Sequence, residues 1–213
     1  MTQRQEGLYR KDEGTVDAEG FIAPSIGLVE HAQYFTTAPD VLAKTRQLLD
    51  QDRLELPGAV IVWDETIGRR KGAKAVPGAW WAGNGRITLG LVFEGSAANT
   101  QQALATAIAA TIEAISSFAP RQPVTHDGHG HVLIDGKLLG MLHHEVYHSH
   151  DLYVIRVNGT TDFSKAPADV QQNHHRLIDY IDPSQLPLGK PGTLPNTLAL
   201  ALMTAIPRHF GIS

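Results

Sequence analysis

Two apolar runs that meet at an Asp-Gly pair are the feature of this sequence that most narrows its fold. Residues 132–142 read VLIDGKLLGML, with Asp135 and Gly136 at the centre. Asp-Gly suits a two-residue turn that needs positive φ, and apolar residues on both sides suit paired strands. The sequence therefore predicts a β-hairpin over residues 132–142, with Lys137 directly after its turn.

Further strands and helices alternate along the chain. Runs of β-branched and other apolar residues predict strands, the first of them buried on both faces, at residues 59–63, 86–94 and 151–157. Apolar residues at helical spacing predict helices at residues 40–49, 99–117 and 196–206. We expect one α/β domain over residues 21–213, behind a mobile tail of residues 1–20.

Composition excludes several classes of function. The chain has no cysteine, which rules out disulfides, thiolate metal ligands and any mechanism through a cysteine thioester. Its net charge is only −4, so no overall field attracts nucleic acid or an anionic membrane. The sequence shows neither a secretory signal nor an apolar run long enough to span a membrane, so we expect a cytoplasmic protein.

A basic, glycine-containing loop follows the first buried strand. Residues 66–74 read TIGRRKGAK, and the cations Arg69, Arg70, Lys71 and Lys74 could close on one phosphate or carboxylate. The loop lacks the spacings of the phosphate loop and of the dinucleotide fingerprint. A solvated basic loop is the alternative interpretation, just as Lys137 could be an ordinary solvated lysine at a hairpin tip.

Five short motifs occur in a fixed order along the chain. They are Phe35-Thr36-Thr37, Glu65-Thr66-Ile67-Gly68-Arg69, Trp80-Trp81, Asp135-Gly136-Lys137-Leu138-Leu139-Gly140-Met141-Leu142 and Val154-Ile155-Arg156-Val157-Asn158. Their order resembles the catalytic domain of the biotin and lipoate protein ligases, from about Val29 to the C-terminus. The corresponding family patterns are Ser-Thr-Asn, Gln-Thr-x-Gly-Arg-Gly-Arg, a tryptophan, Gly-Lys-Lys-x-x-Gly-Ile-Leu-x-Glu and Gly-x-Gly-Ile-Asn.

The resemblance implies a mixed central sheet flanked by helices, like that of class II aminoacyl-tRNA synthetases. It implies that Lys137 is catalytic, because it corresponds to the lysine that binds the activated acid and neutralises charge at the acyl phosphate. Arg69 corresponds to the first arginine of the loop that folds over the ligand. The ligand-binding residues implied are Thr36, Thr37, Glu65, Thr66, Gly68, Arg69, Arg70, Lys71, Trp80, Gly140 and Asn158.

The family also implies substrates and partners. ATP, Mg²⁺ and biotin or a related small carboxylic acid would be bound, and a biotin carboxyl carrier or lipoyl domain would accept the acyl group. A homodimer is compatible with the fold, whereas no nucleic-acid or membrane partner is expected. The chain matches neither the N-terminal DNA-binding helices nor the small C-terminal β-domain of some family members.

The sequence departs from the family patterns at several positions. Arg70 stands where the loop's second glycine belongs, and Lys71 where its second arginine belongs. Glu65 replaces the glutamine of Gln-Thr. The Lys-Trp-Pro-Asn-Asp motif, whose aspartate helps to hold ATP and magnesium, is replaced by residues 127–131, which read DGHGH.

Seven of the eleven histidines fall between residues 126 and 150, namely His126, His129, His131, His143, His144, His148 and His150. On a strand His129 and His131 would share a face, and the hairpin would bring His143 or His144 near them. Converging imidazoles could bind a divalent metal, and His129 or His131 could contact the nucleotide. Surface histidines without a function are the alternative.

Three hypotheses follow from the sequence. The first is an ATP-dependent ligase of the biotin type. The second is an acyltransferase of the lipoate branch, since residues 125–131 faintly resemble the Thr-Tyr-His-Gly-Pro-Gly-Gln string of octanoyltransferases, although those enzymes use a cysteine nucleophile. The third is a degenerate ligase domain that binds a small acid or a metal without turnover.

Overall fold

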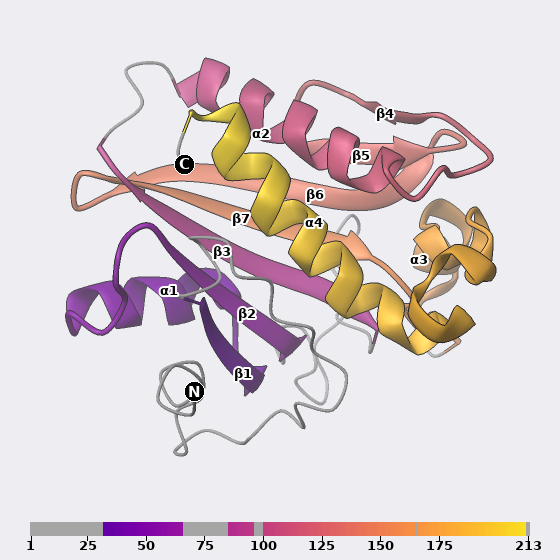
Figure 1. Ribbon diagram of the computed structural model, residues 1–213, viewed down its shortest axis with the longest axis horizontal. Coiled ribbons are helices and arrows are strands. Elements are labelled where there is room, and N and C mark those ends of the chain that lie inside the picture. The colour runs from indigo at the N-terminus through magenta and orange to yellow at the C-terminus, as the bar shows by residue number, and fades with distance from the viewer. Residues whose placement is uncertain (1–31, 66–84, 96–99, 165, 212–213) are drawn as a thin grey trace.

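The computed structural model describes residues 32–65, 85–95, 100–164 and 166–211. They form a seven-stranded sheet with helices on both faces (Figure 1). The strands are β1 (Ala32–Ala38), β2 (Gly58–Glu65), β3 (Arg86–Glu94), β4 (Val124–His126), β5 (His131–Ile134), β6 (Lys137–Tyr147) and β7 (His150–Asn158). The α-helices are α1 (Val41–Asp50), α2 (Thr100–Ser116), α3 (Ala168–Asn173) and α4 (Leu194–His209).

The sheet is mixed, as expected. Its strand order is β1-β2-β3-β7-β6-β5-β4. Strands β1 and β2 pair in parallel, and every other described pair is antiparallel. Between α3 and α4 the chain makes four short 3-10 turns, η5 (Leu177–Asp179), η6 (Pro183–Gln185), η7 (Pro187–Gly189) and η8 (Pro191–Thr193).

The predicted hairpin is confirmed, and a second one follows it. Asp135 and Gly136 turn the chain between β5 and β6 with φ of 51° and 71°. The second strand runs to Tyr147, five residues further than predicted, and turns into β7 at His148 and Ser149, with φ of 47° and 68°. Neither of these residues is glycine, so the second turn has no recognisable sequence signal.

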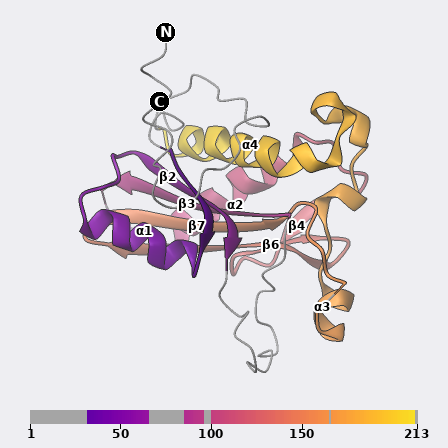
Figure 2. The same cartoon turned by 90° about the horizontal axis from the view of Figure 1, so that it is seen from below.

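Two separate cores lie on the two faces of the sheet. Helices α2 and α4 cover one face, and α1 lies on the other (Figures 1 and 2). The larger core joins α2 and α4 to the sheet through residues such as Leu89, Ile155 and Leu202. The smaller one lies under α1 and includes Val154. We call these the α2/α4 face and the α1 face.

The predicted helices are present, with shifted ends. Asp40 precedes α1, and its side chain accepts hydrogen bonds from the N–H groups of Leu42 at 2.6 Å and Ala43 at 3.4 Å. Helix α4 continues through Pro207 to His209, three residues past its predicted end, and closes where Phe210 N–H donates to the Ile206 and Pro207 carbonyls. None of the described helices is long and apolar enough to cross a membrane.

Candidate acid-binding site

The expected ligand-binding residues divide into those that the structure describes and those that it does not. Thr66, Gly68, Arg69, Arg70, Lys71 and Trp80 lie outside the described residues. Thr36 and Thr37 belong to β1, but their side chains are also outside what is described. The remaining residues form the candidate site, and contact of the loop with a ligand stays a prediction.

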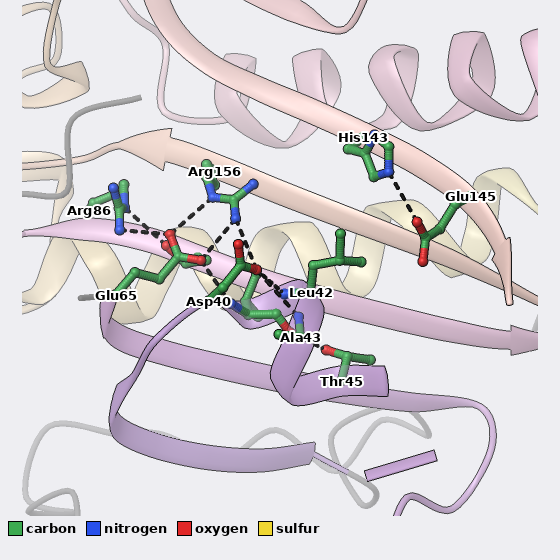
Figure 3. Close-up of polar contacts among 11 residues, drawn as sticks. Asp40, Leu42, Ala43, Thr45, Glu65, Arg86, His143, Glu145 and Arg156 are labelled. Carbon is green, nitrogen blue, oxygen red and sulfur yellow. Dashed lines mark hydrogen bonds and ion pairs between the residues drawn. The ribbon is translucent and has the colours of Figure 1, made fainter. Parts of the chain in front are cut away.

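Glu65, at the end of β2, lies at the centre of a buried ion-pair cluster (Figure 3). Its side chain is fully buried and pairs with Arg86 at 2.8 Å and with Arg156 at 2.9 Å. It also accepts a 2.8 Å hydrogen bond from Val41 N–H, at the start of α1. Asp40 lies 3.6 Å from Arg156. We call Asp40, Glu65, Arg86 and Arg156 the ion-pair cluster.

The charges of the ion-pair cluster balance, with two carboxylates against two guanidinium groups. Burial alone would raise the pKa of Glu65, but the hydrogen bonds and charges of Arg156 and Arg86 outweigh burial and hold that pKa below its ordinary value. Glu65 is therefore ionised at neutral pH. Its two oxygens already have donors, so the direct ligand contact expected for Glu65 remains a prediction.

Arg156 stands at a position where the family pattern has glycine. The pattern Gly-x-Gly-Ile-Asn aligns its two glycines with Val154 and Arg156. Val154 is buried in the core under α1, and Arg156 extends over the same face to reach Glu65 (Figure 3). Two glycines would leave this part of the strand without side chains. In this chain a guanidinium group lies there instead. Its Nε and Nη2 contact Glu65, Nη2 also lies near Asp40, and its Nη1 has no partner among the described residues.

Asn158 supplies a second hydrogen-bond donor on β7, two residues after Arg156. It is fully buried, and it is the register partner of Arg86 on β3. Its Oδ1 accepts from Thr161 Oγ1 at 3.4 Å, whereas its Nδ2 has no partner within the described part of the chain. A buried amide without an acceptor is uncommon in folded proteins and is typical of a place where a ligand or water binds.

Lys137 and Gly140 lie on β6. A Cβ at Gly140 would come within 2.6 Å of the Arg156 carbonyl, so the glycine lets β6 and β7 approach closely. Lys137 is exposed as the first residue of β6. Beside it, His175 N–H donates to the Leu138 carbonyl at 3.0 Å. Burial, and after it the charge of Lys137, lower the pKa of His175.

Residues 127–131 form a loop that is closed by the side chain of Asp127. Its carboxylate accepts from His129 N–H at 2.8 Å and from His131 N–H at 3.1 Å, and it lies 2.6 Å from His131 Nδ1. Burial alone would raise the pKa of Asp127. These hydrogen bonds outweigh burial and lower that pKa to about 2. In the segment that replaces the family's Lys-Trp-Pro-Asn-Asp motif, His131 stands at the position of the last aspartate, and the one carboxylate of the segment, Asp127, is already engaged by it.

The histidines do not converge on a metal. Among the described residues, no group of three or more His, Cys, Asp or Glu side chains could hold an ion. His143 interacts with Glu145 at 3.4 Å, whereas His144 is buried on the other face and lies 2.7 Å from Asp151. Each of these imidazoles has its own carboxylate. The histidine-bound metal considered from the sequence thus finds no support in the structure.

Among the described residues, α1 covers only part of the α1 face. Helix α1 packs against β2 and β3, and strand β6 extends past it (Figure 2). His131, Met141 and Arg156 are register partners in a row across β5, β6 and β7, and register partners share a face. Met141 is half-buried, and the His131 side chain is 44% exposed. We call these three residues the open row.

The fold is that of the biotin and lipoate ligase catalytic domains. A biotin protein ligase from Aquifex aeolicus in complex with biotin and ATP matches with a TM-score of 0.65 and 11% identity, over 85% of this chain and 70% of that one. A Leishmania major biotin protein ligase bound to biotin matches with 0.57 and 14%, over 81% and 73%. A putative lipoate protein ligase from T. acidophilum with bound lipoic acid matches with 0.56 and 9%, over 85% and 86%.

These likenesses rest on structure and not on sequence. No protein-family model matches the sequence, and no curated protein sequence matches it. At identities of 9% to 14% the matches establish the fold, and they leave the acid and the reaction open.

Four members of the site, Asp40, Arg86, Asp127 and Arg156, are not predicted from the sequence as site residues. Arg86 and Arg156 occur within otherwise apolar strands. A charged residue there indicates either an exposed face or a buried partner of opposite charge, and Glu65 at the end of a buried strand was the matching signal.

Proposed function

We propose that this protein activates a small carboxylic acid with ATP, as an acyl adenylate, and transfers the acyl group to a lysine of a carrier protein. Biotin or a related acid is the proposed substrate, and a biotin carboxyl carrier or lipoyl domain is the proposed acceptor. The fold supports this proposal, because solved structures of the same fold hold biotin, biotin with ATP, or lipoic acid.

The observation that carries the proposal is the pair of unpartnered donors on β7. Arg156 Nη1 and Asn158 Nδ2 offer N–H groups and no acceptor, and both belong to the end of β7 next to the ion-pair cluster. Such donors bind carboxylate or phosphate oxygens. Joining an acid to ATP brings two anions together, so fixed donors and cations must offset their repulsion.

Lys137 is the proposed catalytic cation. It begins β6 as an exposed residue at the tip of the hairpin, within the electrostatic reach of His175. In the proposed mechanism its ammonium group neutralises charge that develops on the phosphate as the mixed anhydride forms. The basic loop at residues 66–74 would close over the acid and keep water from the anhydride.

The described residues do not fit a protein-bound magnesium ion. The carboxylates of Asp40 and Glu65 on the α1 face pair with arginines, and Asp127 pairs with His131. Mg²⁺ prefers carboxylate oxygens, and it is often held mainly by nucleotide phosphates. We therefore assign no step to a metal and treat Mg²⁺ only as a companion of ATP.

A second candidate function is acid binding without turnover. The replacement of Lys-Trp-Pro-Asn-Asp by a loop whose only aspartate is engaged by His131 favours it. In that case the unpartnered donors would bind an acid, but no adenylate would form.

One assay separates the two functions. Purified protein is incubated with ATP, magnesium and a panel of carboxylic acids that includes biotin and lipoic acid, and pyrophosphate exchange is measured. A ligase gives acid-dependent exchange that falls by at least about a hundredfold in Lys137→Ala. Lys190→Ala, which removes another exposed lysine, serves as the matched control and should keep full exchange. Acid binding by calorimetry without any exchange would instead establish the binding protein.

A further inference from the structure

His131 and Asp127 form an oriented pair that the proposed function does not yet use. Asp127 Oδ2 lies 2.6 Å from His131 Nδ1, and the other ring nitrogen, Nε2, has no partner in the described parts of the chain. Because the carboxylate accepts a hydrogen bond from Nδ1–H, the neutral ring keeps its proton on Nδ1 and presents a lone pair at Nε2. A carboxylate that orients an imidazole in this way is the arrangement found in general-base catalysis.

The backbone around this pair is fixed. Asp127 also binds the N–H groups of His129 and His131, and Leu142 N–H on β6 donates to the Gly130 carbonyl at 2.7 Å. Gly130 has φ of 99°, and a Cβ there would come within 2.4 Å of the Leu142 carbonyl. The loop can therefore lie against β6 only with glycine at this position, which sets where His131 points.

His131 shares a face with the candidate acid site. It belongs to the open row, with Met141 between it and Arg156. Two strand spacings separate His131 from Arg156, or roughly 10 Å between their backbones. Both side chains are long enough to approach a ligand that lies over Met141. An acceptor amine that lies over Met141 would thus stand between His131 and a carboxyl carbon held by Arg156 and Asn158.

We propose that His131 is the base for the transfer half of the reaction, with Asp127 as its positioning residue. The inference rests on the proposed function, because it needs an acyl adenylate and an acceptor lysine. The acceptor amine attacks the carbonyl carbon, a C–N bond forms, and a proton of the attacking nitrogen passes to His131 Nε2. The bond from that carbon to the phosphate oxygen then breaks, and AMP leaves with the electron pair.

The test separates transfer from activation. Pyrophosphate exchange measures activation, and single-turnover acylation of a lysine amide by supplied biotinyl adenylate measures transfer. We expect His131→Ala to slow transfer by roughly a hundredfold and to leave exchange within about threefold of wild type. Added imidazole should restore much of the transfer in this variant, because a free base can take the same proton.

The chain offers a matched control in a second exposed histidine–aspartate pair. His148 Nε2 lies 3.1 Å from Asp50 Oδ1 at the turn between β6 and β7, and His148 is 66% exposed. His148→Ala removes a comparable surface pair and should change neither rate. Asp127→Asn should slow transfer less than His131→Ala does, since the base remains but its orientation is lost.

A spectroscopic measurement distinguishes a base from a purely structural role of His131. In ¹⁵N-labelled protein the neutral His131 ring should carry its proton on Nδ1, and Asp127→Asn should abolish this preference. His131→Gln, which keeps a polar side chain of similar size, should fold with wild-type circular dichroism and still transfer slowly. Wild-type transfer rates in His131→Gln would overturn the inference.

The two proposals fail in different ways. If wild-type protein shows acid-dependent exchange and His131→Ala transfers at the wild-type rate, His131 is not the base, and the proposed ligase function stands. If no acid gives exchange but transfer from supplied biotinyl adenylate depends on His131, the proposed ligase function is wrong and the role of His131 as a base stands. Neither exchange nor transfer would overturn both.

Discussion

Arg156 donates a hydrogen bond to each carboxylate oxygen of Glu65, with 3.0 Å from Nε to Oε2 and 2.9 Å from Nη2 to Oε1. A paired geometry of this kind is the strongest form of contact between arginine and a carboxylate. It joins β7 to β2, although β3 lies between them in the sheet. The consequences of this pair can be measured in stability and in ligand choice.

Removing the charge of Glu65 should destabilise the fold strongly. In Glu65→Gln the buried guanidinium of Arg86 loses its carboxylate partner, and breaking a buried pair from one side costs about 3 kcal/mol or more. Urea denaturation followed by circular dichroism measures the loss. Glu113→Gln is the control, because Glu113 pairs with Arg208 and His209 on the surface and should show little change. Equal stability of Glu65→Gln and wild type would contradict the ion-pair cluster.

The contribution of Glu65 should also depend on pH. Its folded pKa lies below the ordinary value of 4.5, so the stability it adds is fully present above that value and declines as pH falls through the folded pKa. The difference in unfolding free energy between wild type and Glu65→Gln should stay constant from neutral pH down to the ordinary value and shrink below it. A difference that grows on acidification would mean that the pKa is raised and not lowered.

Two glycines of the 127–131 loop provide a matched pair. Gly128 and Gly130 both have positive φ, of 80° and 99°. A Cβ at Gly128 meets nothing within 4 Å, whereas one at Gly130 meets the Leu142 carbonyl at 2.4 Å. Gly128→Ala should therefore lose about 1 kcal/mol from its backbone conformation, and Gly130→Ala about 2 kcal/mol more from the clash. Thermal and urea denaturation of the two variants give the comparison, and similar losses would place the loop away from β6.

The ligand preference should shift when the family residues are restored. Arg156→Gly combined with Glu65→Gln returns the glycine and the glutamine of the family patterns and removes both members of one ion pair together. Because Arg156 is proposed to donate to the acid, the double variant should bind biotin at least about tenfold more weakly than wild type, a loss of about 1.4 kcal/mol. Calorimetry with biotin measures this. Tighter or unchanged binding would show that Arg156 does not contact the acid.

The sequence predicted the framework better than the site. Asp135-Gly136 and the strand at residues 86–94 follow local rules of turn chemistry and apolar patterning, and both are present as predicted. The pairing of Glu65 with Arg156 joins residues 91 positions apart, and no local pattern encodes such a contact. The metal considered for the histidines finds no support because His143 and His144, on opposite faces of β6, each pair with a different carboxylate, and such pairing cannot be read from histidine spacing.

The Glu65 carboxylate, at the end of β2, contacts three other elements near their ends. It binds Val41 at the start of α1, Arg86 at the start of β3 and Arg156 near the end of β7. A change at any one of these charged positions leaves an unmatched group behind. Evolution can therefore alter them only as a set, and homologous chains should covary at Glu65, Arg86 and Arg156. A relative with glycine at the position of Arg156 is expected to have lost the acidic residue at the position of Glu65 as well.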